Sequence, residues 1–367
     1  MASIVDRIWL KVFYSDRLRN IYKWTLLHRP LSFIPYPTTL EIEPTTMTCP
    51  IQCRICENPH FPKEVRHQMT FDEFKLIVDQ FPVLKWIGLT GIGEAWTNPD
   101  FPKMLKYVKE EKKPFIEIYD NFYFLDEEKI KFLIKYVDRI WISIDGCTKG
   151  TYEKVRLNSD FEKVVKNLTT FFNMKKEMKS KKPKIDFHFI INSLNLKEVP
   201  DFVDWVSSFN LHPKEFLILF TKILHPFEEV KDIYMEEVPL EIIKEAEKRA
   251  AKYNIWIQWA GDISTTEAKH AWKKENPEIG QCCAWLQPFF FSTGEVMPCC
   301  AQNEFGKREW QIERSMGNIF ETKDFKKIWN GERYTELKKM IRKNQTPPYC
   351  EDCPIYKTSV KEKNDKK

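Results

Sequence analysis

The chain of 367 residues has no apolar run long enough to span a bilayer. Its first 37 residues lack the compact apolar core and small-residue cleavage site of a secretory signal. The chain has no large excess of one charge either, because its 58 Lys and Arg are nearly balanced by 53 Asp and Glu, and the two kinds are interleaved along the chain. These absences argue against membrane-spanning, secreted and nucleic-acid-binding proteins, so we expect a cytoplasmic protein with no nucleic-acid partner.

A membrane contact remains open at one place, the segment 1–37. Bulky apolar residues such as Trp9 and Trp24 alternate there with basic residues such as Arg7 and Arg17. An amphipathic helix with this pattern most often packs on its own domain, which is the interpretation we favour. The alternative is a peripheral contact with an anionic membrane surface, and with it a lipid substrate.

Aromatic residues make up 14% of the chain, which argues against disorder, and its length suits one large domain and a smaller one. Strand-like and helix-like stretches alternate at the spacing of βα units, which predicts an α/β fold with a parallel sheet, closed or partly closed into a barrel. The expected strands are 39–45, 86–90, 115–119, 139–145, 185–192 and 215–220.

Polar and glycine-containing motifs follow three of these strands directly. They are Cys49–Cys56 after the first strand, Gly91–Glu94 after the second and Asp145–Gly146 after the fourth. Barrels of this kind carry their chemistry at the carboxyl ends of the strands. We therefore expect the functional site at that end of the sheet.

Ten cysteines are many for a chain without a secretory signal, and nine of them fall in two groups. Cys147 stands alone between the groups, where a small buried side chain is the usual role. Secreted disulfide proteins are normally short, whereas clustered cysteines in an intracellular protein indicate metal. The sequence thus predicts two metal centres.

The first group has the spacing C-x3-C-x2-C, formed by Cys49, Cys53 and Cys56. Three thiolates on one loop can hold three corners of a [4Fe–4S] cluster and leave the fourth iron open to a small molecule. His60 lies four residues later, so a closed zinc site with three Cys and one His is the alternative.

With this motif after its first strand, the sequence resembles the radical S-adenosylmethionine superfamily. The resemblance implies a partial (β/α)6 TIM-like barrel, with S-adenosylmethionine chelating the open iron. Reduction of the cluster would cleave S-adenosylmethionine to a 5′-deoxyadenosyl radical that abstracts hydrogen from a substrate. The residue before the third cysteine, Ile55, departs from the aromatic or Met usual in the family.

Two further stretches carry the resemblance. Thr90–Glu94 lies where the family has a Gly-Gly-Glu-like motif, so Gly93 and Glu94 are expected at the methionyl amino group, where a carboxylate suits an ammonium.

The segment Ile142–Gly146 and the later Arg156 are similar to the family's S-x-D-G segment and its arginine. The resemblance assigns Ser143, Asp145 and Arg156 to the S-adenosylmethionine pocket, with Arg156 at the carboxylate. An ordinary salt bridge is the alternative for Arg156. Asn192, at the end of the fifth strand, is a weaker candidate for the same pocket.

The second group starts at Cys282 and Cys283, continues at Cys299 and Cys300 and ends at Cys350 and Cys353. A turn at Thr293–Gly294 predicts a β-hairpin that brings the first two pairs together. Four thiolates would complete one cluster or one zinc site. Cys299 fits better than Cys300, while Cys282 and Cys283 both fit.

This region resembles the SPASM extension and its shorter relative, twitch, and no cysteine follows Cys353, so we expect one auxiliary [4Fe–4S] cluster in a small domain of a hairpin and a helix. The expected organisation is an N-terminal segment 1–37, the barrel 38–225, a helical connection 226–280, the auxiliary domain 281–355 and a Lys-rich tail 356–367.

The resemblance implies an anaerobic radical S-adenosylmethionine oxidoreductase, maturase or coupling enzyme with an unidentified substrate. The auxiliary cluster would assist electron transfer or bind substrate, and ferredoxin or flavodoxin would serve as the reductant. The competing hypotheses are a zinc-stabilised, non-enzymatic α/β binding protein and a simple electron carrier.

Overall fold

We describe the protein from a computed structural model, which covers residues 36–213, 215–223, 227–259, 279–282, 284–300 and 308–350. The expected amphipathic segment, apart from its last two residues, lies outside these ranges, as do Cys283, Cys353 and the Lys-rich tail. Within the described ranges, no helix combines the length and the apolar character needed to cross a bilayer.

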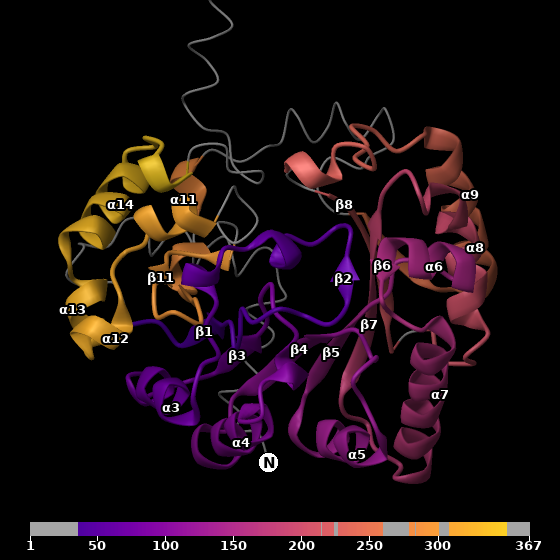
Figure 1. The fold of residues 1–367 in the computed structure, drawn as a ribbon, viewed down its shortest axis with the longest axis horizontal. Helices are drawn as coiled ribbons and strands as arrows, with labels where there is room; N and C mark the ends of the chain where they lie inside the picture. Colours follow the sequence, from indigo (N-terminus) through magenta and orange to yellow (C-terminus); the bar gives the residue numbers. More distant parts are fainter. Residues whose placement is uncertain are drawn as a thin grey trace, which may run out of the picture.

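The central element is a curved sheet in which, across the described residues, nine strands join in the order β11-β10-β1-β3-β4-β5-β7-β8-β9. From β10 to β9 every neighbouring pair is parallel. The barrel strands are β1 (Thr39–Ile42), β3 (Trp86–Leu89), β4 (Phe115–Asp120), β5 (Arg139–Ser143), β7 (Lys184–Ile191), β8 (Leu217–Lys222) and β9 (Trp256–Trp259). The strands fan out as an open barrel with helices outside it (Figure 1).

Alternation of side chains explains why the strands pack this way. On β1, Leu40 and Ile42 are fully buried and point outward toward the helices, whereas Glu41 lines the interior. The helices that cover the outer face carry apolar stripes and are mostly capped by polar residues, as at Thr70, whose side chain accepts from the backbone of Glu73. They are α3 (Phe71–Asp79), α4 (Phe101–Tyr107), α5 (Glu127–Tyr136), α6 (Lys149–Val155), α7 (Phe161–Glu177), α8 (Val199–Ser207) and α9 (Leu240–Tyr253).

The C-terminal region begins with a hairpin that extends the barrel sheet. Its strands are β10 (Phe289–Phe290) and β11 (Val296–Met297), with β10 parallel to β1 and β11 antiparallel to β10. Gly294 has φ +94 in the turn, and an added Cβ would lie 2.5 Å from the Phe320 ring, so the position requires glycine. Among the described residues that follow, four α-helices lie on the β1 side of the molecule (Figure 1): α11 (Arg308–Glu313), α12 (Ile319–Thr322), α13 (Phe325–Trp329) and α14 (Glu332–Arg342).

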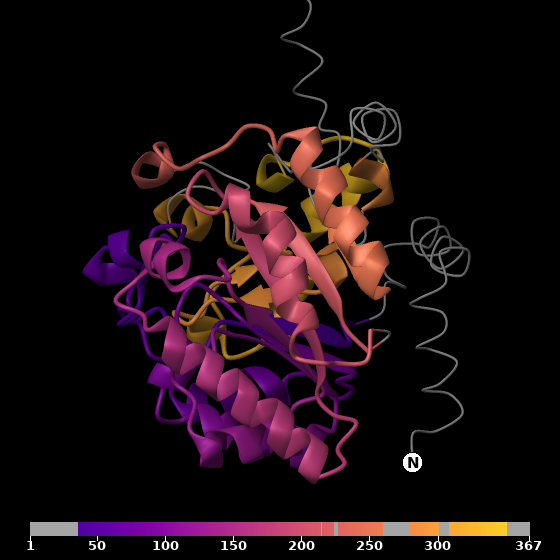
Figure 2. The same cartoon turned by 90° about the vertical axis from the view of Figure 1, so that its right-hand side faces the viewer.

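The predicted α/β fold, with its partial barrel and small C-terminal domain, is confirmed. Viewed after a quarter turn (Figure 2), helices lie in front of the strands of the sheet. One feature differs from the sequence-based expectation, because the region expected as a helical connection contributes β9 as well as α9. Between α6 and α7, the short strand β6 (Arg156–Leu157) pairs with β2 (Gln52–Cys53).

Candidate active site

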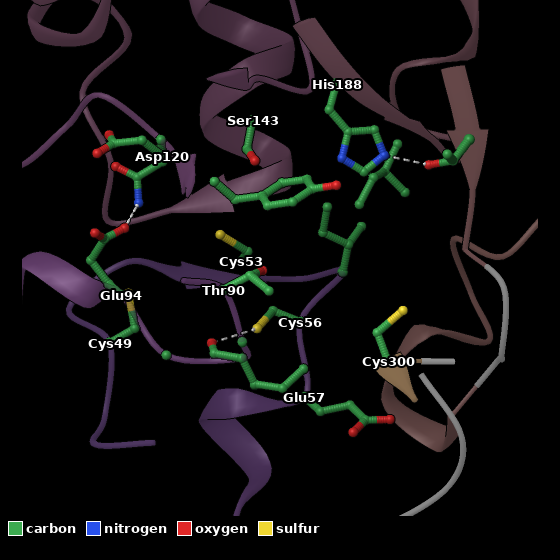
Figure 3. Close-up of a pocket in the computed structure, with 18 of the residues that line it drawn as sticks. Cys49, Cys53, Cys56, Glu57, Thr90, Glu94, Asp120, Ser143, His188 and Cys300 are labelled. Carbon is green, nitrogen blue, oxygen red and sulfur yellow. Dashed lines mark hydrogen bonds between the residues drawn. The ribbon is translucent and has the colours of Figure 1, made fainter. Parts of the chain in front are cut away.

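A cavity of ≈ 470 Å³ opens at the carboxyl ends of the barrel strands. The side chains of Cys49, Cys53 and Cys56 line it together with Glu94 and Ser143 (Figure 3), and Gly93 and Arg156 line it as well. The structure thus brings together seven of the nine residues predicted for the first cluster and its ligand, at the end of the sheet where the strand-end motifs lie.

One buried side chain, Asn58, shapes the cysteine loop. Its amide oxygen accepts from the backbone N–H of Cys49 at 2.9 Å, and its Nδ2 donates to Met47 O at 3.1 Å. Its own backbone N–H donates to the Cys56 sulfur at 3.4 Å, which favours a thiolate there. Arg66 closes the loop from outside by donating to Asn58 O at 2.8 Å.

The β2–β6 pairing sets the position of Cys53. Cys53 lies directly opposite Arg156 in this antiparallel pair. The Arg156 Nη1 then lies 3.9 Å from the Cys53 sulfur. Two residues 103 positions apart are thus joined, and a buried positive charge stands beside one of the thiols.

The three thiols are poised for a metal that supplies positive charge. Burial raises the pKa of Cys49 to about 12 and raises the pKa values of Cys53 and Cys56 as well. Without a cation they would stay protonated, whereas metal binding deprotonates them. Among the described residues, no three His, Cys, Asp or Glu side chains are placed to hold a single metal ion. A [4Fe–4S] cluster needs no such convergence, because each thiolate binds its own iron.

The glycine loop after β3 fits closely against the start of the cysteine loop. An added Cβ at Gly93 would lie 2.0 Å from the backbone oxygen of Thr45, and Gly91 has φ +155 with its Cβ position 2.4 Å from Glu43 Cγ. Only glycine allows this approach. The backbone N–H of Ile92, between them, donates to Glu43 Oε1 at 3.1 Å.

Glu94 ends this loop with its carboxylate in the cavity. It accepts from the backbone of Trp96 at 3.2 Å and from the side-chain amide of Asn121. Burial, and next the negative charge of Asp120, raise the pKa of Glu94 to about 8. Ionising Glu94 in this buried position is therefore costly. A ligand that brings hydrogen-bond donors or positive charge would stabilise its carboxylate form.

Arg156 and Asp145 form a buried ion pair rather than two separate ligand contacts. Arg156 donates to Asp145 Oδ2 from Nε at 2.8 Å and from Nη2 at 2.6 Å. Asp145 also accepts from the backbone of Ile190 at 2.7 Å and is fully buried. Arg156 still lines the cavity, but Asp145 reaches it only through the arginine.

Asn192 lies apart from the other predicted ligand residues, because it is fully buried and does not line the cavity. Its amide oxygen accepts from Leu194 N at 3.1 Å and its Nδ2 donates to Ile190 O at 3.2 Å. These bonds stabilise the turn after β7. The sequence placed Asn192 at a strand end but could not show that its side chain turns back onto the backbone.

The second cysteine group is described in part. Cys282 is buried in the main core, Cys350 packs against that core, and Cys299 lies near the buried Tyr334, whose pKa it helps to raise. Cys300 instead lines the active-site cavity, as does Glu57 (Figure 3). The structure thus directs the two adjacent cysteines to different surroundings.

Sequence reasoning missed Asn58, Arg66 and Asn121, which shape the site without belonging to a metal-spacing motif. Asn121 carries a usable signal, since it lies just after the third expected strand. Asn58 and Arg66 lie in an irregular loop, where single polar residues give no pattern.

Two family models match this chain. The Radical SAM superfamily model matches residues 44–206, and the iron–sulfur cluster-binding domain model SPASM matches residues 282–354. Among curated proteins, the tungsten-containing aldehyde ferredoxin oxidoreductase cofactor-modifying protein of Pyrococcus furiosus is 27% identical over 84% of this chain and 85% of its own length. A probable GTP 3',8-cyclase of Methanocaldococcus jannaschii is 23% identical over 71% and 84%.

Solved structures agree in fold. Streptococcus suis SuiB bound to S-adenosylmethionine matches with a TM-score of 0.62 at 17% identity, covering 93% of this chain and 77% of that one. Native anSMEcpe with bound AdoMet and Kp18Cys peptide has a TM-score of 0.58 at 16% identity, covering 86% of each chain.

Proposed function

Because this chain belongs to the radical S-adenosylmethionine superfamily and carries a C-terminal SPASM domain, we propose specific roles for the residues of its cavity. The chain is an enzyme with a [4Fe–4S] cluster and S-adenosylmethionine as cofactors, and it needs a reductant and a substrate. When bound, these cofactors supply a 5′-deoxyadenosyl radical that abstracts hydrogen. The zinc-stabilised binding protein is not favoured.

Cys49, Cys53 and Cys56 are the proposed ligands of this cluster. The observation that carries the proposal is that all three thiols line one cavity together with Glu94 and Ser143. Buried thiols with raised pKa values become good ligands once a metal displaces their protons. The remaining iron of the cluster would then face the rest of the cavity.

Around S-adenosylmethionine, each proposed contact has its own physical reason. The Gly93 backbone can approach the ligand because it carries no side chain, and Glu94 offers an acceptor to the amino group. Ser143 supplies a hydroxyl from the end of β5. Arg156, held by Asp145, attracts the carboxylate, and we assign Asp145 the role of positioning Arg156.

For the C-terminal region we propose one auxiliary [4Fe–4S] cluster within an auxiliary domain 281–355, next to a barrel domain 38–225. Its ligands would be Cys299, Cys350, Cys353 and one residue of the pair Cys282 and Cys283. Cys299 is favoured over Cys300 because Cys300 lines the active-site cavity, together with the first cysteine group. Ferredoxin or flavodoxin is the proposed electron donor.

The proposed substrate class is a cofactor or its precursor. Support comes from the Pyrococcus furiosus relative, which is named for modifying the cofactor of a tungsten-containing oxidoreductase and aligns over 84% of this chain. Structures of SuiB and anSMEcpe contain bound peptides, so a peptide is the competing substrate class. Stimulation by a peptide would contradict this proposal. Incubating the reduced enzyme with candidates of both classes, and measuring stimulation of 5′-deoxyadenosine formation, separates them.

Counting iron and sulfide after anaerobic reconstitution tests the two-cluster assignment. The wild-type chain should bind about eight irons, and the triple variant C49A/C53A/C56A about four. Cys147→Ala is the matched control, because Cys147 lies outside the cavity lining, and it should keep all eight. Stoichiometric zinc in place of iron in the wild-type protein would contradict the proposal.

A further inference from the structure

The C-terminal region reaches into the S-adenosylmethionine site through buried polar contacts behind the cavity. Arg308, at the start of α11, donates from Nη2 to Glu43 Oε1 at 2.8 Å, and the backbone of Ser292 donates to the other oxygen of Glu43 at 3.3 Å. The Ser292 hydroxyl lies 2.9 Å from that of Thr46, just before the cysteine loop. Three contacts thus converge on the segment that leads from β1 to the cluster ligands.

Glu43 connects these contacts to the glycine loop. The same Oε1 that accepts from Arg308 also accepts from the backbone N–H of Ile92, and Glu43 packs against Gly91 so closely that an added Cβ would collide with it. Ile92 is separated from Glu94 only by Gly93. Moving Glu43 therefore moves the loop that carries Gly93 and Glu94.

Burial makes the Arg308–Glu43 pair decisive for this geometry. Arg308 is 1% exposed and Glu43 0%, and the guanidinium lies 3.8 Å from the centre of the Phe291 ring and 4.9 Å from that of Phe61. Water cannot take the place of either charge at this depth, so the pair fixes the position of Glu43.

We infer that Arg308 is a positioning residue through which the C-terminal region holds the S-adenosylmethionine loop in its binding geometry. This inference rests on the proposed function of the cavity. It extends the role of the C-terminal region beyond holding an auxiliary cluster, because the contact needs none of that region's cysteines. Removing the cation leaves the buried Glu43 carboxylate without a counter-charge, so Glu43 must shift, and the Ile92 contact changes with it.

The dissociation constant of S-adenosylmethionine tests this inference. It is measured on the reconstituted full chain, from the change that the ligand causes in the spectrum of the reduced cluster. Arg308→Gln should keep its iron but bind S-adenosylmethionine about tenfold more weakly, the usual effect of losing a charged hydrogen bond. Arg308→Lys should recover part of the loss. Arg314→Gln is the matched control, since Arg314 follows the same helix but stacks on Trp310, and its affinity should stay at the wild-type value.

If Arg308→Gln does not fold, the double variant E43Q/R308Q removes both buried charges and keeps an acceptor for Ile92. It should still bind S-adenosylmethionine more weakly than wild type, because residue 43 is no longer held from the C-terminal region. The loss should be smaller than the tenfold expected of Arg308→Gln, because no buried charge is left unpaired. Wild-type affinity in either iron-loaded variant would overturn the inference while leaving the proposed function intact. Absence of S-adenosylmethionine cleavage by the wild-type enzyme would instead overturn the proposed function.

Discussion

The two faces of the barrel sheet differ sharply in chemistry although they belong to the same strands. On the outer face, Ile87, Ile142 and Phe187 are fully buried beneath helices. On the inner face, side chains of the barrel strands include Tyr119 on β4 and His188 on β7, which line the cavity. A parallel sheet covered on both faces normally carries apolar residues on both.

The two faces of each strand therefore have different roles. Outward side chains exclude water and stabilise the fold, while inward ones stay polar because they surround a ligand space. His188 illustrates the second role. Its Nε2 pairs with the Thr221 hydroxyl at 2.9 Å, and burial lowers its pKa to about 4, so the ring is neutral at physiological pH. A neutral ring adds no positive charge to a cavity that must admit a sulfonium.

The largest expected effect comes from truncating one aromatic residue on each face. Phe187→Ala should lower the free energy of unfolding by about 3–5 kcal/mol, because Phe187 is fully buried against Phe202 and Phe216. Tyr119→Ala should cost only about 1 kcal/mol, since Tyr119 is 38% exposed. Denaturant unfolding under anaerobic conditions measures both free energies. Equal losses in the two variants would contradict the distinction between the two faces of the sheet.

Glu94→Gln should produce the next largest effect, and on the ligand rather than the fold. S-adenosylmethionine affinity should fall about tenfold or more, because a charged acceptor is lost. The pKa of Glu94 is raised to about 8, so in wild-type protein the carboxyl ionises and affinity grows as pH rises toward 8. The Gln variant lacks this component, and the difference between the two pH profiles isolates it.

The control for this prediction is Glu128→Gln, an exposed residue of α5 paired with Lys131, which should keep the wild-type pH profile. The same shift acts on stability. The folded apoprotein holds a proton that the unfolded chain releases from about pH 4.5, so unfolding free energy should decrease between pH 4.5 and 8 in wild-type protein and less in the Gln variant. Identical profiles for wild type and E94Q would place Glu94 outside the binding site.

The smallest expected effect is that of Ser143→Ala, which removes one neutral hydroxyl from the inner end of β5. Affinity for S-adenosylmethionine should fall about threefold to tenfold, while the unfolding free energy stays near that of wild type. Ser208→Ala, at the exposed end of α8, is the matched control and should alter neither quantity. A stability loss without an affinity change would assign Ser143 to the fold.

Local pattern sufficed to predict much of this arrangement. Strand-like stretches marked the barrel strands, and cysteine spacing marked the cluster loop, without any knowledge of the fold. Both signals lie within a few consecutive residues. The six expected barrel strands are present for the same reason, since their apolar residues recur with the period of a strand.

Contacts between distant segments could not be predicted. Nothing in a two-residue strand indicates that Arg156 faces Cys53, and nothing near Arg308 identifies Glu43 as its partner. The parallel pairing of β10 with β1 also joins segments about 250 residues apart, so no local periodicity reports it. The residues that position the site, rather than those that carry its chemistry, are therefore the ones that needed the structure.

Formation of 5′-deoxyadenosine tests the central claim most directly. The reconstituted chain, reduced with dithionite under anaerobic conditions and given S-adenosylmethionine, should release it, and C49A/C53A/C56A should not. Variants of Cys299 and Cys350 should still cleave S-adenosylmethionine, because the radical chemistry belongs to the cavity of the first cysteine group. Cleavage that survives in the triple variant, or its absence from fully iron-loaded wild-type enzyme, would contradict the account.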